Sequence, residues 1–322
     1  MKDTSDTVSV IIPAYNIEGY IARSIESALA QTCRPHEIIV TDDGSTDRTA
    51  QRIKPFGSNV RYIYQDNAGL AAARNAAIKI ATGRWIALLD GDDEWLPEKL
   101  EAQMDLLHRT PHLVWADCNL YTMQHGSNTK TICNDPQLVE QYLHGKECFD
   151  SFFDACNAGI LMTGSSMIIR RDIFDRVGLY QEGSPYAEDI DMYWRIAYRW
   201  PQIGYVRQPL AIYHVARPGS LTNATHERNI LNAICDIFQH HLTLAAHSGH
   251  QRQITPFIAQ KLRKWIYIAY RRGQFDSAEK SIKQFRHLLP ACYRWVYALC
   301  LVLPRPSIRI NKRILKWLGY HE

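Results

Sequence analysis

The sequence predicts an α/β fold: a mostly parallel sheet flanked by helices, followed by a helical region at the C-terminal end. Two observations carry this prediction. Short apolar runs alternate four times with helical periodicity in about the first 95 residues, with short connections, which indicates parallel strands joined by right-handed crossovers. From about residue 224 onward the periodicity is helical throughout. We therefore expect one domain over residues 1–224 and a helical region over 225–322.

Four strand and helix units make up the first part of this sheet. Strands are expected at residues 8–12, 37–41, 60–64 and 85–89, and helices at 18–31, just after 45–46, and at 68–81. Ser45 or Thr46 is expected to cap the second helix. No G-x-G-x-x-G sequence follows the first strand and no P-loop lysine is present, which argues against the common dinucleotide and NTPase sites.

The rest of the first domain is expected to be less regular. We expect a helix at 97–109, strands at 113–117, 163–170 and 211–214, and a helix from Glu188 to about Arg199. Residues 119–160 show no clear periodicity and are interpreted as an insertion.

Composition limits the class of protein. The 322 residues are 46% hydrophobic and 22% charged, as in an ordinary globular protein. The eight cysteines include no C-x-x-C pair, so neither zinc spacing nor a disulfide framework is indicated, and a reducing cytosol is expected. We expect no signal peptide and no transmembrane helix, because no apolar run approaches about 20 residues. The expected location is therefore the cytoplasm.

An acidic cluster ends the fourth expected strand. Asp90, Asp92 and Asp93 follow the apolar run of residues 85–89 directly. Ligands of open α/β sheets bind at the carboxyl ends of the strands, and carboxylate oxygens suit Mg²⁺ or Mn²⁺. The alternative is a solvated acidic turn that caps the following helix.

Five motifs occur in an order that is familiar from one enzyme family. They are V-I-I-P-A-Y-N at 10–16, T-D-D-G-S-T-D at 41–47, N-A-G-L-A-A-A-R-N at 67–75, L-D-G-D-D at 89–93 and E-D-I-D at 188–191. With these motifs, the chain resembles the inverting family 2 glycosyltransferases, which have the GT-A fold, a Rossmann-like α/β sheet. The resemblance covers roughly residues 8–108 and 163–199.

The resemblance implies a pocket for the nucleotide of a sugar donor. Pro13, Tyr15 and Asn16 would line it, with Tyr15 stacking on the base, and Asp42 and Asp43 would hydrogen-bond the base or ribose. Taken alone, the Asp-Asp-Gly-Ser sequence is equally a good turn and helix cap.

The next two motifs would hold the rest of the donor. Gly69 would approach the donor closely, and Arg74 would lie near charge; a packed, alanine-rich helix is the simpler interpretation of most of that segment. Asp90 would face the ribose or the metal, Asp92 would bind the metal, and Asp93 would support them. The implied cofactor is Mn²⁺ or Mg²⁺.

By this resemblance, the last motif would supply the catalytic base. Asp189 would take the proton of the acceptor hydroxyl, and Glu188 would orient it or bind the acceptor; alternatively, these acidic residues only favour the N-terminus of their helix. Many relatives carry a histidine soon after the last strand. Here that region does not align cleanly, and either His214 or Arg217 could contact the metal or the diphosphate.

The expected function is sugar transfer from a nucleotide sugar to an acceptor hydroxyl, with inversion. The acceptor is expected to be a saccharide or lipid-linked saccharide used for cell-surface polysaccharide, and residues 119–160 are expected on the acceptor side. Two alternatives remain. One is a nucleotidyltransferase, which would require a basic glycine-rich loop near the first strand. The other is a catalytically silent scaffold that binds nucleotide sugar or membrane.

Charge is unevenly distributed along the chain. Residues 1–250 hold 22 Lys and Arg against 30 Asp and Glu, whereas residues 251–322 hold 15 against 3. Within residues 309–318, apolar and basic residues recur on separate helical faces, a pattern typical of a helix that lies on an anionic membrane. Peripheral attachment to the cytoplasmic face is one interpretation, and a helical subdomain packed on the catalytic domain is the other. No nucleic-acid partner is expected.

Overall fold

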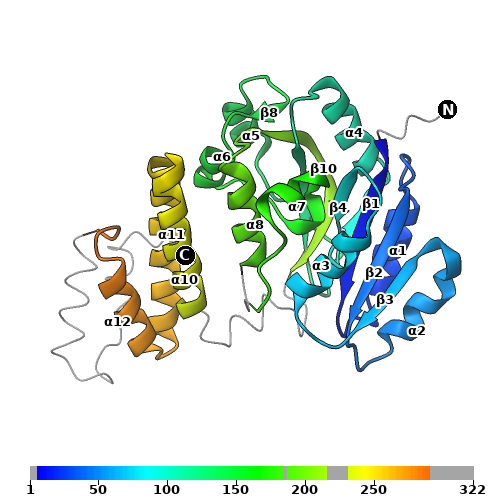
Figure 1. Ribbon diagram of the computed structural model, residues 1–322, viewed down its shortest axis with the longest axis horizontal. Helices are drawn as coiled ribbons and strands as arrows, with labels where there is room; N and C mark the ends of the chain where they lie inside the picture. The colour runs from blue at the N-terminus through cyan, green and yellow to red at the C-terminus, as the bar shows by residue number, and fades with distance from the viewer. Residues whose placement is uncertain (1–5, 184–186, 216–230, 291–322) are drawn as a thin grey trace. The chain divides into compact units, whose positions relative to one another are not determined.

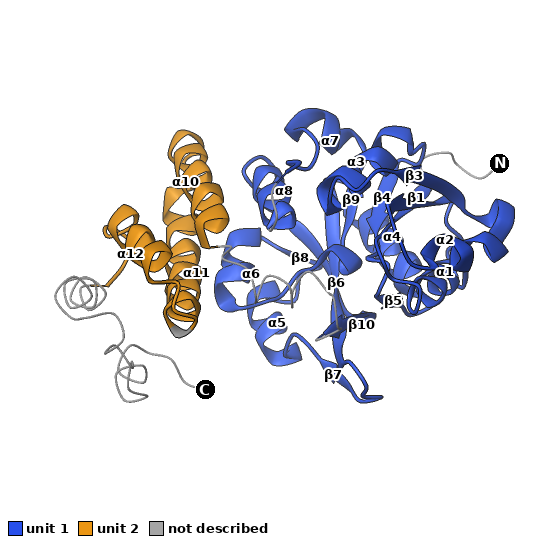
Figure 2. Ribbon diagram, turned by 90° about the horizontal axis from the view of Figure 1, so that it is seen from below, with its two compact units in different colours: residues 1–220 blue, residues 221–322 orange. Residues whose placement is uncertain are grey.

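The computed structural model describes residues 6–183, 187–215 and 231–290. The chain divides into two compact units, Met1–Ser220 and Leu221–Glu322, which Figure 2 colours blue and orange. The first unit contains the sheet, and the described part of the second unit is helical. The boundary expected near residue 224 falls outside the described ranges and stays a prediction.

The first unit is an α/β structure, which confirms the predicted fold class (Figure 1). Its strands are β1 (Val8–Ala14), β2 (Glu37–Asp43), β3 (Arg61–Gln65), β4 (Trp85–Leu88), β5 (Glu94–Trp95), β6 (Trp115–Gln124), β7 (Lys130–Ile132), β8 (Cys148–Phe149), β9 (Ile168–Arg170) and β10 (Ile203–Val215). Its helices are α1 (Ile21–Leu29), α2 (Thr49–Ile53), η2 (Lys54–Asn59), α3 (Leu70–Ile80), α4 (Lys99–Arg109), α5 (Pro136–Leu143), α6 (Phe152–Ala158), η3 (Gly164–Ser166), α7 (Asp172–Val177) and α8 (Glu188–Ala197).

One sheet contains all of these strands. Its main order is β3-β2-β1-β4-β9-β6-β10-β5, and the first four strands are parallel, as predicted. The antiparallel pairings of β4 with β9 and of β9 with β6 are short, whereas β6 and β10 form a long parallel pair. The carboxyl ends of β1, β2 and β4 therefore lie at one edge of the sheet.

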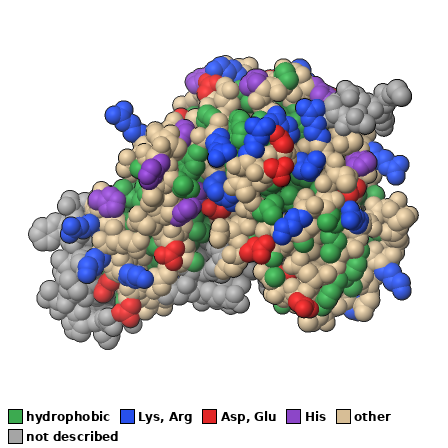
Figure 3. Space-filling view, viewed as in Figure 1, with side chains coloured by type: hydrophobic (Ala, Val, Ile, Leu, Met, Phe, Trp, Pro, Cys, Tyr) green, Lys and Arg blue, Asp and Glu red, His purple; other side chains and the backbone are tan. Residues whose placement is uncertain are grey.

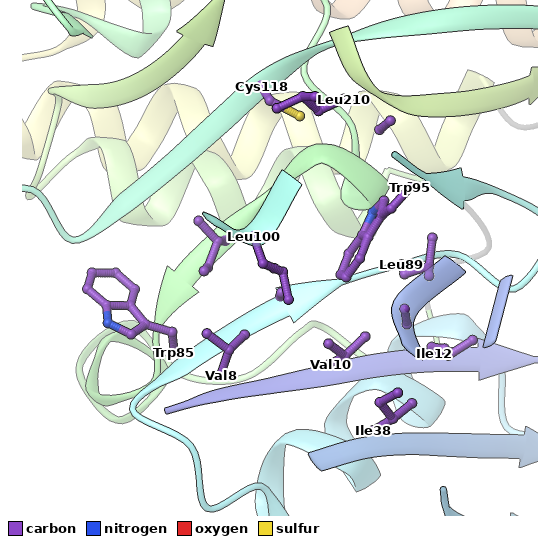
Figure 4. Packing of buried hydrophobic residues seen from close by; sticks show 14 of the residues in the cluster. Val8, Val10, Ile12, Ile38, Trp85, Leu89, Trp95, Leu100, Cys118 and Leu210 are labelled. Atoms are coloured by element: carbon purple, nitrogen blue, oxygen red, sulfur yellow. The ribbon is translucent and has the colours of Figure 1, made fainter. Parts of the chain in front are cut away.

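A buried apolar cluster fixes that edge. Every residue of β1 is buried. Figure 4 shows Val10 and Ile12 of β1 beside Ile38 of β2, with Leu89, Trp95 and Leu100 on neighbouring segments. Burial of such side chains stabilises the fold by roughly 1.5–3 kcal/mol each. The strand ends that follow are consequently held on a rigid base.

The predicted cap of the second helix is wrong. The helix α2 begins at Thr49, and the carboxylate of Asp47 accepts the Thr49 backbone N–H at 2.9 Å. The Ser45 hydroxyl instead accepts the backbone N–H of Asn16 at 3.0 Å. Ser45 joins the end of β2 to the end of β1, a long-range contact that a local capping pattern does not reveal.

Residues 119–160 are more regular than the sequence indicated. They complete β6 and form β7, α5, β8 and α6. Asn119 interrupts the apolar pattern expected of a buried strand such as β6, because it is a polar residue at a buried position. Its side chain is satisfied there by the backbone N–H and C=O of Asn134, at 3.2 and 2.9 Å. Similarly, the pairing of β10 with β6 shifts register on both sides of Pro209. Only the end of β10 was therefore predicted from the sequence.

The described part of the second unit consists of α10 (Leu231–Ser248), α11 (Gln251–Arg271) and α12 (Phe275–Gln284). Ile234, Phe238, Ile258 and Phe285 are among the side chains that these helices and the residue after α12 bury. Across the described part of the chain, no helix is both long and apolar enough to cross a membrane. The amphipathic segment expected at residues 309–318 lies outside the described residues.

Charged side chains of both signs are scattered over the surface. Figure 3 shows acidic and basic groups interspersed on the face in view. Side chains mixed in this way are solvated by water, and their pairs contribute little to stability. The acidic groups that matter for chemistry are instead those held at the strand ends.

Candidate active site

The acidic turn after β4 packs directly against β1. The backbone N–H of Asp93 bonds the carbonyl of Asp90 at 2.9 Å and closes the turn. A side chain at Gly91 would place its Cβ 2.7 Å from the backbone carbonyl oxygen of Pro13, closer than atoms can pack. Glycine at this position therefore lets the turn reach the end of β1 and fixes where Asp90 and Asp92 lie.

Asp93 supports the turn from beneath. It is fully buried, and its carboxylate accepts the backbone N–H of His214 at 2.9 Å and the hydroxyl of Ser165. The same Ser165 hydroxyl accepts the backbone N–H of Asp90 at 3.1 Å. Burial raises the pKa of Asp93 well above its usual value, and the charges of Asp92 and Asp90 add to that rise. Asp93 thus joins the acidic turn to η3 and β10.

Arg74 joins the acidic turn to the first turn of α8. Its guanidinium is buried, with Nη2 2.6 Å from Asp90 Oδ1 and Nη1 2.9 Å from Glu188 Oε1. Burial by itself would lower the pKa of Arg74, but the charges of Asp90 and Glu188 raise it above its usual value. The guanidinium also lies over the ring of Tyr180, 5.4 Å from its centroid. Three residues predicted from separate motifs therefore meet in one ion-pair network.

The Glu188 and Asp189 pair opens α8, as predicted. The preceding residue, Ala187, has a φ of 64°, an uncommon left-handed conformation for a residue with a side chain. Burial and the charge of Asp189 raise the pKa of Glu188 to about 7, against the opposing effect of Arg74. Burial also raises the pKa of Asp189, whose Oδ1 accepts the backbone N–H of Ile190 at 2.7 Å. A carboxylate with a raised pKa is a better proton acceptor near neutral pH.

The ends of β1 and β2 hold the residues predicted to bind the nucleotide. Tyr15, which directly follows β1, is 49% exposed, and Pro13 within β1 is buried. Asn16 has a φ of 50°, and its side-chain oxygen accepts the backbone N–H of Thr46 at 2.8 Å. An exposed ring beside an ordered polar turn is available for a planar ligand such as a base.

Asp42 and Asp43 are buried and already accept hydrogen bonds within the protein. Asp42 accepts the Tyr62 hydroxyl and the Ser45 backbone N–H, each at 2.9 Å. Asp43 accepts the backbone N–H groups of Ala68 and Gly69 at 2.9 and 2.8 Å, and the side-chain amides of Gln65 and Asn67 at 2.7 and 3.1 Å. Asp43 therefore uses about all four of its acceptor positions to fold the segment before α3, whereas Asp42 retains acceptor capacity.

The side chain of His214 bonds to charged residues outside the predicted site. The Nε2 atom of His214 lies 2.7 Å from Glu94 Oε1 and 3.1 Å from Arg23 Nη2. Arg23 Nε is also 2.9 Å from Glu94 Oε1. Arg217 lies outside the described residues. A metal or diphosphate contact of either residue stays a prediction.

The donor atoms at the acidic turn suit a hard divalent cation. No group of three or more His, Cys, Asp or Glu side chains in the described ranges is arranged to hold a metal by itself. Asp90 and Asp92 offer two carboxylates, however, and Mg²⁺ is commonly bound by one or two carboxylates together with substrate phosphates. The residues present therefore fit a cation that arrives with a diphosphate.

Three residues at this site were not identified from the sequence: Gly164, Ser165 and Tyr180. The first two were interpreted as part of a strand, but they form the helical turn η3, which Thr163 and Ser166 cap reciprocally. The Thr-x-x-Ser spacing was the available signal for that capping box. No local signal distinguishes Tyr180, which reaches the site only through the tertiary fold.

One protein-family model matches more than half of the chain. The model of the family described as "Glycosyl transferase family 2" matches residues 9–178. An uncharacterized glycosyltransferase of Rickettsia prowazekii is 33% identical over 193 residues, which cover 59% of this chain and 58% of that protein. This chain thus spans little more than half the length of that relative.

One further relative is named by an activity, and one solved structure by its bound ligand. WfgD of Escherichia coli, a UDP-Glc:alpha-D-GlcNAc-diphosphoundecaprenol beta-1,3-glucosyltransferase, is 44% identical over 102 residues, covering 31% of this chain and 40% of WfgD. The crystal structure of Staphylococcus aureus TarS 1–349 in complex with UDP-GlcNAc aligns with a TM-score of 0.63 at 17% identity, covering 92% of this chain and 87% of that one. At this identity, the likeness to TarS shows the fold alone.

Proposed function

The chain belongs to glycosyl transferase family 2, and we propose that it transfers a sugar from a nucleoside-diphosphate sugar to an acceptor hydroxyl with inversion at the anomeric carbon. One observation carries this proposal. A single buried guanidinium, that of Arg74, contacts both Asp90 at the expected donor site and Glu188 of the expected base pair. Donor and acceptor chemistry would thus meet within one site.

Each group has a role in this reaction. Asp189 accepts the proton of the attacking hydroxyl, and Glu188 orients the acceptor or the base. A positioned base of this kind contributes about 10²–10⁴-fold in rate. Asp92, with Asp90, would hold Mn²⁺ or Mg²⁺, which would stabilise the charge on the leaving diphosphate. Tyr15 and Asp42 hold the base and ribose.

The proposed donor is a UDP-sugar and the proposed acceptor a saccharide on a lipid diphosphate. Solved TarS structures with UDP-GlcNAc and with UDP support the donor class, and the name of WfgD supports the acceptor class. A lipid-linked acceptor would place the enzyme at a membrane surface. The basic balance of residues 251–322, 15 Lys and Arg against 3 Asp and Glu, supports peripheral attachment to its cytoplasmic face.

Binding and transfer by the purified full chain test this function. We expect UDP-glucose or UDP-GlcNAc to raise the thermal unfolding temperature in the presence of Mn²⁺, because a ligand that binds only the folded state stabilises it. We also expect transfer of the sugar to GlcNAc-diphosphoundecaprenol or a short-chain analogue. ADP-glucose serves as the control donor. Stabilisation without transfer to any saccharide acceptor would favour the scaffold alternative.

Sugar transfer is expected to fall as the pH is lowered through about 7. Burial and the charge of Asp189 raise the pKa of Glu188 to about 7, and burial raises that of Asp189. The two groups titrate as a pair, and a protonated pair is a poor base. The profile of kcat/KM between about pH 5 and 9 measures this effect.

Glu188→Gln provides the control for the pH profile. It removes a neighbouring negative charge and should move the acidic limb to lower pH. A profile that is flat across this range would contradict a role for the pair in proton transfer. The raised pKa of Glu188 also makes stability depend on pH, in the direction opposite to activity. Its contribution to the free energy of unfolding is complete below about pH 4.5 and is lost as the pH rises through about 7.

A further inference from the structure

The Arg74 guanidinium is enclosed on several sides. Asp90 and Glu188 each pair with one of its terminal nitrogens, at 2.6 and 2.9 Å, and the Tyr180 ring lies against it. The backbone of Gly164 is also close, because a Cβ on that residue would lie 2.9 Å from Arg74 Nη2 and 3.4 Å from Asp90 Oδ2. The side chain of Arg74 is 2% exposed. Its position is therefore determined by its neighbours and not by solvent.

We propose that Arg74 is a positioning residue that couples the donor site to the catalytic base. This inference rests on the proposed function above. The three side chains come from the end of β4, from α3 and from the first turn of α8. Removing one partner of a buried ion pair leaves an uncompensated charge, so Asp90, Arg74 and Glu188 hold one another in place. A change at Asp90 when a donor binds is then transmitted through Arg74 to Glu188 and to the adjacent Asp189.

The geometry explains the choice of residue types. An arginine presents its N–H donors in a rigid planar fork, so two carboxylates on different elements can each take one terminal nitrogen. A lysine keeps the charge but has one nitrogen on a flexible chain. At Gly164 the absence of a Cβ leaves room for the fork. Gly164→Ala would consequently displace Arg74 without removing any charge from the site.

The decisive measurement is UDP affinity in the presence of Mn²⁺ for Glu188→Gln. In the proposed function Glu188 belongs to the acceptor side, so a purely local role predicts unchanged UDP affinity. Coupling predicts a loss of roughly tenfold, within the range for residues of one ion-pair network, because Arg74 would then be balanced by Asp90 alone and would hold it away from the donor. Unchanged UDP affinity in Glu188→Gln would overturn the inference.

Turnover of Arg74→Lys gives a second readout. We expect kcat to fall by roughly 10²-fold in Arg74→Lys, the lower part of the range for loss of a positioned base. Adding Glu188→Gln to this variant should lower kcat little further, because both changes disrupt the same ion-pair network of Asp90, Arg74 and Glu188. A double variant whose loss equals the product of the two single losses would show that the residues act independently. If Arg74→Lys fails to fold, Gly164→Ala replaces it, with the same expected loss of kcat.

Arg195→Lys is the matched control. Arg195 forms another ion pair on α8, a partly buried one with Asp191 at 2.6 Å, and its other hydrogen bonds go to backbone carbonyls of residues 177–179. It should lower thermal stability while leaving UDP affinity unchanged. If the wild-type chain neither binds UDP-sugar nor transfers sugar, the proposed function fails and the coupling with it. If the wild type transfers sugar and the variants behave independently, only the coupling is overturned.

Discussion

Asp189→Asn is expected to lower kcat by about 10²–10⁴-fold while leaving UDP affinity unchanged, because the amide cannot accept the proton of the acceptor hydroxyl. The fold should survive, since the asparagine side-chain oxygen can still accept the backbone N–H of Ile190, as Asp189 Oδ1 does at 2.7 Å. Steady-state transfer at saturating acceptor measures kcat, and calorimetric titration with UDP and Mn²⁺ measures donor binding. The separation of the two effects identifies the base.

The matched control for this change lies in the same turn of α8. Asp191→Asn removes a carboxylate two residues away that pairs with Arg195 at 2.6 Å and has no proposed part in the reaction. It should reduce thermal stability but retain turnover. If Asp189→Asn instead keeps near-normal turnover, Asp189 is not the base, and Glu188→Gln becomes the variant to examine for that role.

The parallel strands β1 to β4 could be predicted because each is marked by residues close together in the sequence. The strands β1, β2 and β4 each contain a short apolar run, and polar residues come at the end of each strand or within two residues of it. Parallel strands share the edge at which they end, so the motifs at 13–16, 42–47 and 90–93 could be placed together before the structure was known. The pattern failed where buried polar residues are satisfied by distant partners, as Asn119 is by Asn134.

The candidate site was predictable as a set of residues but not as a network. Arg74 and Glu188 are 114 positions apart, and no spacing rule relates them. The carboxylate of Asp43 accepts the backbone N–H groups of Ala68 and Gly69, which its motif did not indicate, and its ligand contact stays a prediction. Both findings depend on which elements the tertiary fold brings side by side. Family resemblance predicted the residues of the site, and the structure shows which of them are bonded to one another.

Asp92→Asn is expected to reduce UDP affinity measured with Mn²⁺ to the value measured with EDTA, and to abolish sugar transfer. The change removes a charged oxygen ligand but keeps the side-chain shape, and the backbone contact of the Asp92 carbonyl with Arg23 Nη2, at 3.4 Å, does not depend on the carboxylate. The fold and thermal stability without ligand should therefore be retained. A loss of at least tenfold, about 1.4 kcal/mol, is readily measured by titration.

Asp105→Asn, the same chemical change at an exposed position on α4, should leave both affinities unaltered. Mn²⁺-dependent UDP affinity that persists in Asp92→Asn would remove Asp92 from the metal site and leave Asp90 as the remaining carboxylate ligand to test.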